Sequence, residues 1–441
     1  MLARSRRAAA LRAPRHPIVL ASIMLCLLAV APRLASLLSR SPLRIRRPRW
    51  GAAMAGSAAA AEPVVHTAAL RAAPASTAAA PAAPATLAAA PAASAALLPS
   101  ARWPLCNHTS TGEASACDDG TPAGFNRVPD SLPMPFPCYW ANVSYGTVLR
   151  RPLQMCTHDP AVDTTIAKLI HRDHSWEGTG LIVSFVRMVK SGLICTRERP
   201  FVLDLGMNIG FNSLIFLELG CHVISFEPLK QNLLRARESV RANGLAERFT
   251  VFNNAVSNRE SPLYMQFNEG NPGASTAYPQ RLGGDWGGEK WTCVMSVTMD
   301  AFFSWADRPL SPTTGLPVSP SEISFVKVDI EGHDVAAFDG MQGVLQAATP
   351  PIPFLTAEFS MLMAHHASRC WGEELLRMMI ELGYASWDHY NVLLDAAALL
   401  ARAEAASFRL PKEARKGQAP DYEFMFQHEL VDKSVGLRLS N

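Results

Sequence analysis

The sequence predicts an α/β fold with a doubly wound sheet. Apolar runs of strand length alternate with segments of helical spacing from about residue 180 onward, which is the pattern of such sheets. The first clear run, FVLDLG at 201–206, is almost continuously apolar, as expected of a parallel strand buried on both faces. Residues 1 to about 100 are mostly Ala, Pro, Arg, Leu and Ser, and we expect no packed structure from them.

Each element follows from a local pattern. Ile182, Phe185, Val186 and Val189 recur at i, i+3, i+4 and i+7, which predicts a helix. Gly220 and the pair Asn243-Gly244 are typical of residues that end helices. We expect strands at 201–206, 221–228, 248–256, 323–332, 353–360 and 421–427, and helices at 211–220, 230–244 and 372–384.

Composition divides the chain into five segments. They are a basic lead and targeting segment (1–38), an Ala/Pro linker (39–100), a lead-in with cysteines and glycosylation sequons (101–158), the α/β domain (159–430) and a tail (431–441). We expect the linker to act as a semi-rigid, disordered spacer.

The N-terminal segment has three interpretations. An apolar run of 14 residues spans 18–31, and counting on to Leu38 gives 21 residues, close to the roughly 20 that span a bilayer. Its basic flanks favour a signal anchor that holds the protein to a membrane with a lumenal catalytic domain. The alternatives are a cleaved signal peptide and an Arg-rich, acid-free transit peptide to a plastid or mitochondrion.

The cysteines favour the secretory pathway. Four of the nine fall in the lead-in, at Cys106, Cys117, Cys138 and Cys156. The same segment holds sequons at Asn107 and Asn142. An even cluster in a loop-rich segment predicts disulfides, hence an oxidising Golgi or ER lumen and a glycoprotein, and the alternative is four reduced thiols in an organelle. The scattered cysteines Cys195, Cys221, Cys293 and Cys370 are interpreted as buried thiols.

The charge is unevenly distributed. Of the 41 basic residues, eleven are Arg within residues 1–61, where there is no Asp, Glu or Lys, so the rest of the chain carries 30 basic and 38 acidic residues. A mildly acidic folded part disfavours a nucleic acid partner, because phosphate-backbone binding depends on clustered Lys and Arg.

The first strand-to-helix turn predicts a small ligand. It reads D-L-G-M-N-I-G from Asp204 to Gly210. Gly206 lets the backbone turn tightly and approach a ligand, and Gly210 permits close packing where the next helix begins. The second strand ends at Glu227, where a carboxylate can accept hydrogen bonds from both hydroxyls of a ribose. The pattern therefore indicates an adenosine-containing cofactor.

The identity of the cofactor depends on Asn208. The dinucleotide fingerprint needs a glycine there to bring bare backbone against a pyrophosphate, so the asparagine favours a smaller cofactor. Asp204, just before the turn, can face a ligand ammonium. S-adenosylmethionine, which combines an amino acid with a ribose, fits both observations better than NAD does.

Five blocks resemble one family. FVLDLGMNIGFNS, HVISFEPLKQNL, VFNNAVSN, VTMDAFF and FVKVDIEGHD, preceded by HSWEGTG, occur in the order typical of the FkbM-type S-adenosylmethionine-dependent methyltransferases, over about residues 160–430. The resemblance implies a class I methyltransferase (Rossmann-like) fold and O-methylation, often of sugars. It implies that the methionine end is lined by Asp204, Gly206, Asn208 and Gly210, the ribose by Glu227, and the adenine by Asn254 and Ala255. For Asn254, a turn residue at a strand end is an equal alternative.

The acceptor chemistry is expected after the fourth strand. An attacking alcohol needs a general base or a metal to remove its proton. Asp329, Glu331 and His333 share one face if the strand continues through them, and we expect direct participation of Asp329 and Glu331, with His333 as a second candidate base. The same carboxylates suit Mg²⁺, whereas the adjacent pair His365-His366 lacks the spacing of a zinc site.

Further side chains have open roles. We expect Lys327 to pair with a neighbouring acid and Glu358 to lie near the acceptor. The run 268–291 predicts a mobile substrate loop in which Tyr278, Trp286 and Trp291 can stack on a sugar, and an ordinary surface loop is the alternative.

The sequence thus predicts a membrane-anchored O-methyltransferase acting on a carbohydrate hydroxyl. A lipid or small polyol acceptor, an inactive nucleotide-binding module and an NAD-dependent oxidoreductase are the alternatives.

Overall fold

The structure is a computed structural model. It describes residues 102–106, 117, 123–146, 148–176, 179–268, 270–278, 291–359, 370, 372–388, 393–394 and 422–428. The expected targeting segment, the Ala/Pro linker and the C-terminal tail lie outside the described residues. Within these ranges, every helix is too short or too polar to cross a bilayer.

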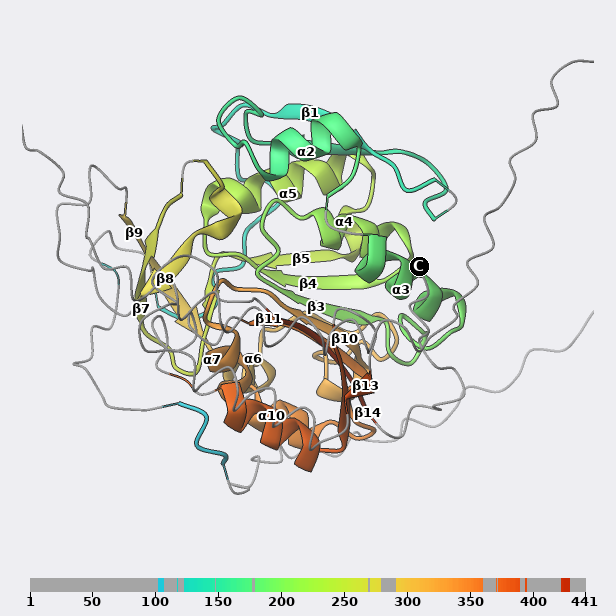
Figure 1. Cartoon of the computed structure of the whole chain (residues 1–441), viewed down its shortest axis with the longest axis vertical. Helices are drawn as coiled ribbons and strands as arrows, with labels where there is room; N and C mark the ends of the chain where they lie inside the picture. Colours follow the sequence, from blue (N-terminus) through green and yellow to red (C-terminus); the bar gives the residue numbers. More distant parts are fainter. Residues whose placement is uncertain are drawn as a thin grey trace, which may run out of the picture. The chain divides into compact units, whose positions relative to one another are not determined.

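An eight-stranded sheet forms the centre of the domain, as predicted (Figure 1). Its strands, from one edge to the other, are β13 (Leu393–Leu394), β12 (Tyr384–Asp388), β14 (Tyr422–His428), β11 (Phe354–Phe359), β10 (Ile323–Val328), β3 (Phe201–Leu205), β4 (His222–Phe226) and β5 (Phe249–Phe252). The strands from β11 to β5 are parallel, and β14 runs antiparallel to β11 and β12. The order reverses between β3 and β10, where ligands of such sheets bind.

Helices cover both faces of the sheet (Figure 1). One face carries α2 (Ile166–Asp173), α3 (Thr179–Lys190), α4 (Phe211–Glu218) and α5 (Lys230–Ala242). The other carries α6 (Met299–Ser304), α7 (Asp334–Asp339), α8 (Gln342–Ala347) and α10 (Gly372–Glu381). Helix α4 is buried from Phe211 to Leu217, which explains why its residues are apolar on all sides except at Asn212 and Ser213.

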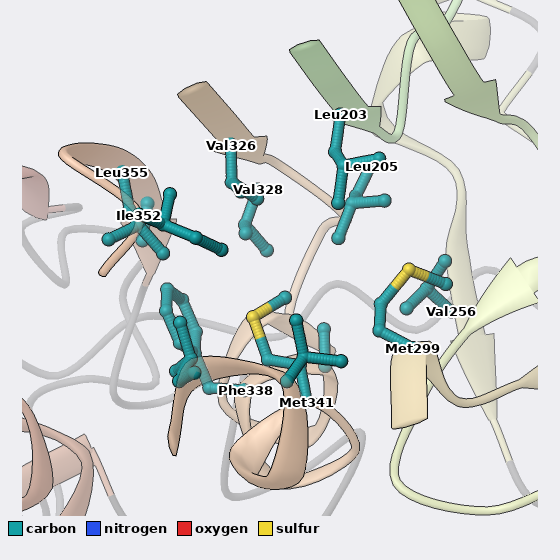
Figure 2. Packing of buried hydrophobic residues seen from close by; sticks show 14 of the residues in the cluster. Leu203, Leu205, Val256, Met299, Val326, Val328, Phe338, Met341, Ile352 and Leu355 are labelled. Carbon is teal, nitrogen blue, oxygen red and sulfur yellow. The ribbon is translucent and has the colours of Figure 1, made fainter. Parts of the chain in front are cut away.

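The strand side chains alternate between these two layers. Leu203, Leu205, Val326 and Val328 pack toward Phe338 and Met341 on one face (Figure 2). The intervening Val202 and Phe325 pack against α3 and α4 on the other. Two polar residues lie among these apolar ones. They are Asp204 on β3 and Lys327 on β10, which stand opposite each other in the strand register. A buried charge without a partner of opposite sign lowers the stability of the fold, so the Asp204 and Lys327 side chains stabilise each other.

A smaller sheet adjoins the first at its β5 side. It consists of β6 (Ala255–Val256), β9 (Trp291–Val297), β7 (Pro262–Gln266) and β8 (Thr276–Tyr278). The sequence predicted one strand over 248–256, but Asn253 and Asn254 interrupt it, and β5 and β6 belong to different sheets. The Asn254 side chain bonds three backbone groups, on Asn126, Gly124 and Met295, which fixes the break.

The lead-in segment is part of the folded domain. Its hairpin of β1 (Tyr139–Val143) and β2 (Leu153–Thr157) is antiparallel, and β2 lies against α5 through the Cys156 N–H, which donates to Ser239. Residues 126–128 bond to the free edge of β5. These contacts cover a strand edge that would otherwise be open.

All eight cysteines among the described residues form disulfides. The pairs are Cys106–Cys370, Cys117–Cys293, Cys138–Cys156 and Cys195–Cys221. The disulfides expected in the lead-in are present. The expectation of buried thiols at Cys195, Cys221, Cys293 and Cys370 is wrong. Cys293 and Cys370 pair with lead-in cysteines 176 and 264 residues away, and Cys195 pairs with Cys221 across 26 residues.

Candidate functional site

A cavity of about 510 Å³ opens at the carboxyl ends of β3, β4 and β10. Eight of the ten predicted site residues line it: Gly206, Asn208, Glu227, Asn254, Ala255, Asp329, Glu331 and His333. Lys327 and Glu358 line it too. The topology explains this gathering, since parallel strands bring the residues that follow them to one edge of the sheet.

The glycine turn is packed against the loop that follows β10. Gly206 has φ +82°, and a Cβ on it would lie 1.9 Å from the backbone oxygen of Asp329. Gly210 also has φ +82°, and its Cβ would lie 2.5 Å from the Cβ of Ala236 on α5. The close packing expected at Gly210 is therefore present, although Gly210 is outside the cavity lining. Only a glycine allows either approach.

Glu227 stands at the end of β4 with both oxygens held by backbone. The Asn208 N–H donates to Oε2 at 2.9 Å, and the Leu229 N–H donates to Oε1 at 2.9 Å. Asn208 adopts φ +55°, a left-handed conformation that asparagine tolerates better than most residues. Burial raises the pKa of Glu227 to about 7. Each oxygen keeps a second lone pair, so the carboxylate can accept two further hydrogen bonds.

Asp204 supports the turn from below the cavity surface. It is fully buried, it accepts a hydrogen bond from Ser213 at 2.6 Å, and it does not line the cavity. Lys327 lies between two carboxylates, with Nζ 3.7 Å from Asp204 Oδ1 and 2.9 Å from Asp329 Oδ2. The pairing expected of Lys327 is confirmed. In this position Asp204 contacts Lys327 and lies outside the cavity lining. The expected contact of Asp204 with a ligand ammonium stays a prediction.

The acidic residues after β10 lie on a tight loop. β10 ends at Val328, and Glu331 and Gly332 have φ +53° and +95°. The prediction that Asp329, Glu331 and His333 share the face of an extended strand is therefore wrong. Asp334 holds the loop by accepting the N–H groups of Ile330 and Gly332, each at 3.1 Å. Burial, followed by the charge of Asp329, raises the pKa of Asp334 to about 7.

His333 is a buried, neutral imidazole. It is 3% exposed, and burial lowers its pKa to about 4. Nε2 lies 2.9 Å from the backbone oxygen of Ala277, which only accepts, so Nε2 carries the proton. Nδ1 is then an acceptor, and it is buried with no hydrogen-bond partner. The His333 side chain is therefore held inside the protein and does not face solvent.

Sequence reasoning missed several contributors to the cavity, among them Trp176 and Asn232. Trp176, from the HSWEGTG stretch, lines it, and so does Asn232 on α5, whose Oδ1 bonds His158 at 2.7 Å. Both lie in blocks that carried the family resemblance, which was the available signal.

Part of the expected substrate loop lies among the described residues. Residues 271–275 and Ala277 line the cavity. Tyr278 and Trp291 pack edge to face with centroids 5.9 Å apart and are not in the lining. Trp286 lies outside the described residues.

The described residues contain no group of three or more His, Cys, Asp or Glu side chains that could hold a metal ion. His365 and His366 are outside the described residues. The arrangement of the cavity can bind a ribose-containing ligand at Glu227 and place carboxylates and an imidazole beside it.

Residues 204–385 match the family model of the methyltransferase FkbM domain. Solved structures are also similar. They include a SAM-dependent methyltransferase from Agrobacterium tumefaciens (10% identity, 66% of this chain and 70% of that chain, TM-score 0.32). Another is the O-methyltransferase TomG from Streptomyces achromogenes, involved in tomaymycin synthesis (10%, 62% and 91%, TM-score 0.27). A third is a methyltransferase from Geobacter sulfurreducens (13%, 62% and 90%, TM-score 0.27). No curated protein matches the chain.

Proposed function

The chain carries an FkbM methyltransferase domain and is an S-adenosylmethionine-dependent methyltransferase, and from this premise we propose that it methylates a hydroxyl of a carbohydrate. One observation supports the proposal above the others. A carboxylate suited to a ribose, Glu227, shares a single cavity with two acidic side chains and a neutral histidine. In this proposal Glu227 binds the methyl donor, and the two acidic side chains and the histidine bind and deprotonate an alcohol acceptor.

We propose that the donor lies along the glycine turn. The residues fit the group, because Glu227 keeps a lone pair on each oxygen for the two ribose hydroxyls, which donate. Gly206 and Asn208 flank the methionine end, with Asp204 and Gly210 supporting them from outside the lining. Ala255 and the backbone of Asn254 are left for the adenine, since the Asn254 side chain is engaged elsewhere.

Bound S-adenosylmethionine supplies a methyl group already activated by its sulfonium. The chain must orient the acceptor hydroxyl within about 3–3.5 Å of that methyl and accept its proton. Lys327 holds Oδ2 of Asp329, which leaves Oδ1 for the hydroxyl. Glu331 and His333, on the same loop, also line the cavity, and His333 is the second candidate base. We propose that the carboxylates of Asp329 and Glu331 accept the proton of the acceptor hydroxyl.

The double variant Asp329→Asn/Glu331→Gln tests this assignment. It keeps the shape of the loop and removes both bases, so turnover should be lost while S-adenosylhomocysteine still binds. Asp307→Asn/Glu260→Gln changes two exposed acids in the same way and serves as the control. Retained turnover in the first variant would contradict the assignment. We propose that these carboxylates remove the proton directly, and Mg²⁺ bound through the same oxygens is the alternative. Activity that persists in excess chelator supports the direct route, whereas activity that is lost with chelator and restored by Mg²⁺ supports the alternative.

The acceptor is tested by mass spectrometry of glycans from cells that lack the protein. We expect a loss of glycans heavier by one methylene group. Unchanged glycans with altered lipids or polyols would favour those acceptors instead. Binding of the donor with no consumption in any extract would favour an inactive module, and tight NAD binding would favour an oxidoreductase.

We further propose that the domain works in the lumen of the secretory pathway, held by the N-terminal segment. The four disulfides support an oxidising compartment. Asn142 supports it as well, because this sequon asparagine is exposed on β1. A glycosidase-sensitive shift in mass that disappears in Asn142→Gln and Asn107→Gln is expected. Import into a plastid or mitochondrion without a shift would contradict the proposal.

A further inference from the structure

We propose that an N-linked glycan on Asn142 covers Trp140, with the first sugar ring lying against the indole; this inference rests on the proposed location in the secretory lumen. Neither residue lines the cavity. At 49% exposed, Trp140 is the most exposed aromatic side chain among the described residues, and Phe136 and Tyr139, 36% each, lie within four residues of it. Apolar surface that is gathered in this way is typical of a contact site.

The strand register places Trp140 and Asn142 on one face of the hairpin of β1 and β2. Side chains alternate along a strand, so residues two apart point the same way and lie about 7 Å apart. The opposite face is internal, because Val143 and its partner Leu153 are buried in the core. Asn142 is exposed, as is its partner Gln154. Trp140 and Asn142 therefore share the outward face.

The backbone that carries both residues is held at each end. The backbone oxygen of Asn142 lies 3.1 Å from Nδ1 of His174, at the end of α2. The disulfide between Cys138 and Cys156 closes the other end of the hairpin. A rigid attachment lowers the entropy that a group on Asn142 loses when it contacts Trp140.

The sequon supplies the point of attachment. Asn142 is followed by Val143 and by Ser144, which is exposed and completes the acceptor pattern. The co-reactant is a lipid-linked oligosaccharide diphosphate. The amide nitrogen of Asn142 forms a bond to C1 of its first sugar and loses one proton, while the bond from C1 to the phosphate oxygen breaks and the lipid diphosphate leaves. The first sugar then stands on the same face as Trp140.

A sugar ring is complementary to the indole face. The C–H groups of a pyranose are weakly positive, whereas the face of an aromatic ring is negative. Contact also removes apolar indole surface from water, while the sugar hydroxyls stay hydrated. A protein partner seated on Trp140 would have to accommodate the glycan beside it. The neighbouring sequon therefore favours sugar as the occupant of this surface.

The test uses the full chain produced in cells with a secretory pathway. Three forms are compared: intact, trimmed by an endoglycosidase to one sugar on Asn142, and fully deglycosylated by an amidase. Hydroxyl-radical oxidation of Trp140 is followed by peptide mass spectrometry. We expect the intact and the one-sugar forms to oxidise several-fold more slowly than the deglycosylated form, and Trp305, stacked on Phe125, to react equally in all three.

The variant Ser144→Ala is the matched control, because it removes the sequon and keeps both Asn142 and Trp140. Its Trp140 should oxidise as fast as in the deglycosylated form. Slow oxidation that persists in this variant would mean that protein covers the indole, and equal oxidation in all forms would mean that nothing does. Either result overturns the inference and leaves the lumenal location intact. An Asn142 that carries no glycan overturns both, and methyl transfer is unaffected.

The variant Trp140→Ser separates the contact from the glycan itself. Removal of the Asn142 glycan should lower the Tm of the wild type and leave the Tm of Trp140→Ser unchanged, because only the wild type loses a contact. Equal decreases in the two proteins would contradict the contact. Methyl transfer should be the same in both, since Trp140 lies outside the cavity lining.

Discussion

Replacing Gly206 by alanine tests how closely the glycine turn and the acidic loop depend on each other. The new Cβ would lie 1.9 Å from the Asp329 oxygen and 2.7 Å from Ile330 Cγ2. The first of these neighbours is backbone, so a side-chain rotation does not relieve the contact. The turn or the loop after β10 must therefore move.

The size of the effect follows from two contributions. Holding alanine at a left-handed φ costs about 1–2 kcal/mol. Restoring a normal contact requires the distance to grow from 1.9 Å to at least 3.0 Å. A displacement of about 1 Å at a site that positions reacting groups lowers the rate by about 100-fold.

Gly192→Ala is the matched control. Gly192 has φ +71°, and a Cβ there meets nothing within 4 Å, so that variant has only the conformational cost. Isothermal titration with S-adenosylhomocysteine and thermal unfolding are the assays. We expect both variants to lose stability, Gly206→Ala the more. We expect Gly206→Ala alone to bind S-adenosylhomocysteine more weakly and, in a turnover assay, to transfer methyl groups about 100-fold more slowly. Equal affinities for the two variants would refute the close fit of turn and loop.

Three further predictions concern the site and its support. Burial raises the pKa of Glu227 to about 7 in the free protein, and the ribose hydroxyls need its ionised form as acceptor. Affinity for S-adenosylhomocysteine should therefore rise about tenfold between pH 6 and pH 8. Titration calorimetry should show this rise together with proton release, and an affinity that does not change with pH would refute the assignment of Glu227 to the ribose. Lys327→Met leaves Asp204 and Asp329 without their cation and should lower the free energy of unfolding by about 3–5 kcal/mol, whereas Lys230→Met at an exposed position should be neutral in the same denaturant titration. The Cys195–Cys221 disulfide closes a separation of 26 residues, so the double alanine variant should lose about 3 kcal/mol; no loss, with free thiols found by alkylation of the wild type, would restore the interpretation of these residues as buried thiols.

The sequence was sufficient for the elements with a strong local signal. The strands at β3 and β4 and the helices α4 and α5 lie within a residue or two of their expected bounds, since buried parallel strands and glycine-ended helices have distinct patterns. The short strands of the smaller sheet had no such signal. Their pairing is long-range, as between Leu263 and Val294.

The sequence identified most of the predicted residues that line the cavity, but it did not predict the conformation of the loop after β10. Residues that follow parallel strands converge on one edge, so Glu227 and Asp329 were placed together by topology alone. The conformation of the loop was missed because Glu331 adopts φ +53°, which a non-glycine residue rarely does. The partners of Cys195, Cys221, Cys293 and Cys370 were missed because connectivity depends on the fold.

Glu227 is proposed to accept hydrogen bonds from the ribose hydroxyls of the methyl donor, and one titration tests this most directly. Two hydrogen bonds from ribose hydroxyls to a charged acceptor contribute roughly 1.5–3 kcal/mol each. Glu227→Ala should therefore weaken S-adenosylhomocysteine binding by at least about 100-fold, while Glu247→Ala at an exposed position binds as the wild type does. If the folded Glu227→Ala protein binds S-adenosylhomocysteine with wild-type affinity, Glu227 does not bind the ribose and the central claim is contradicted.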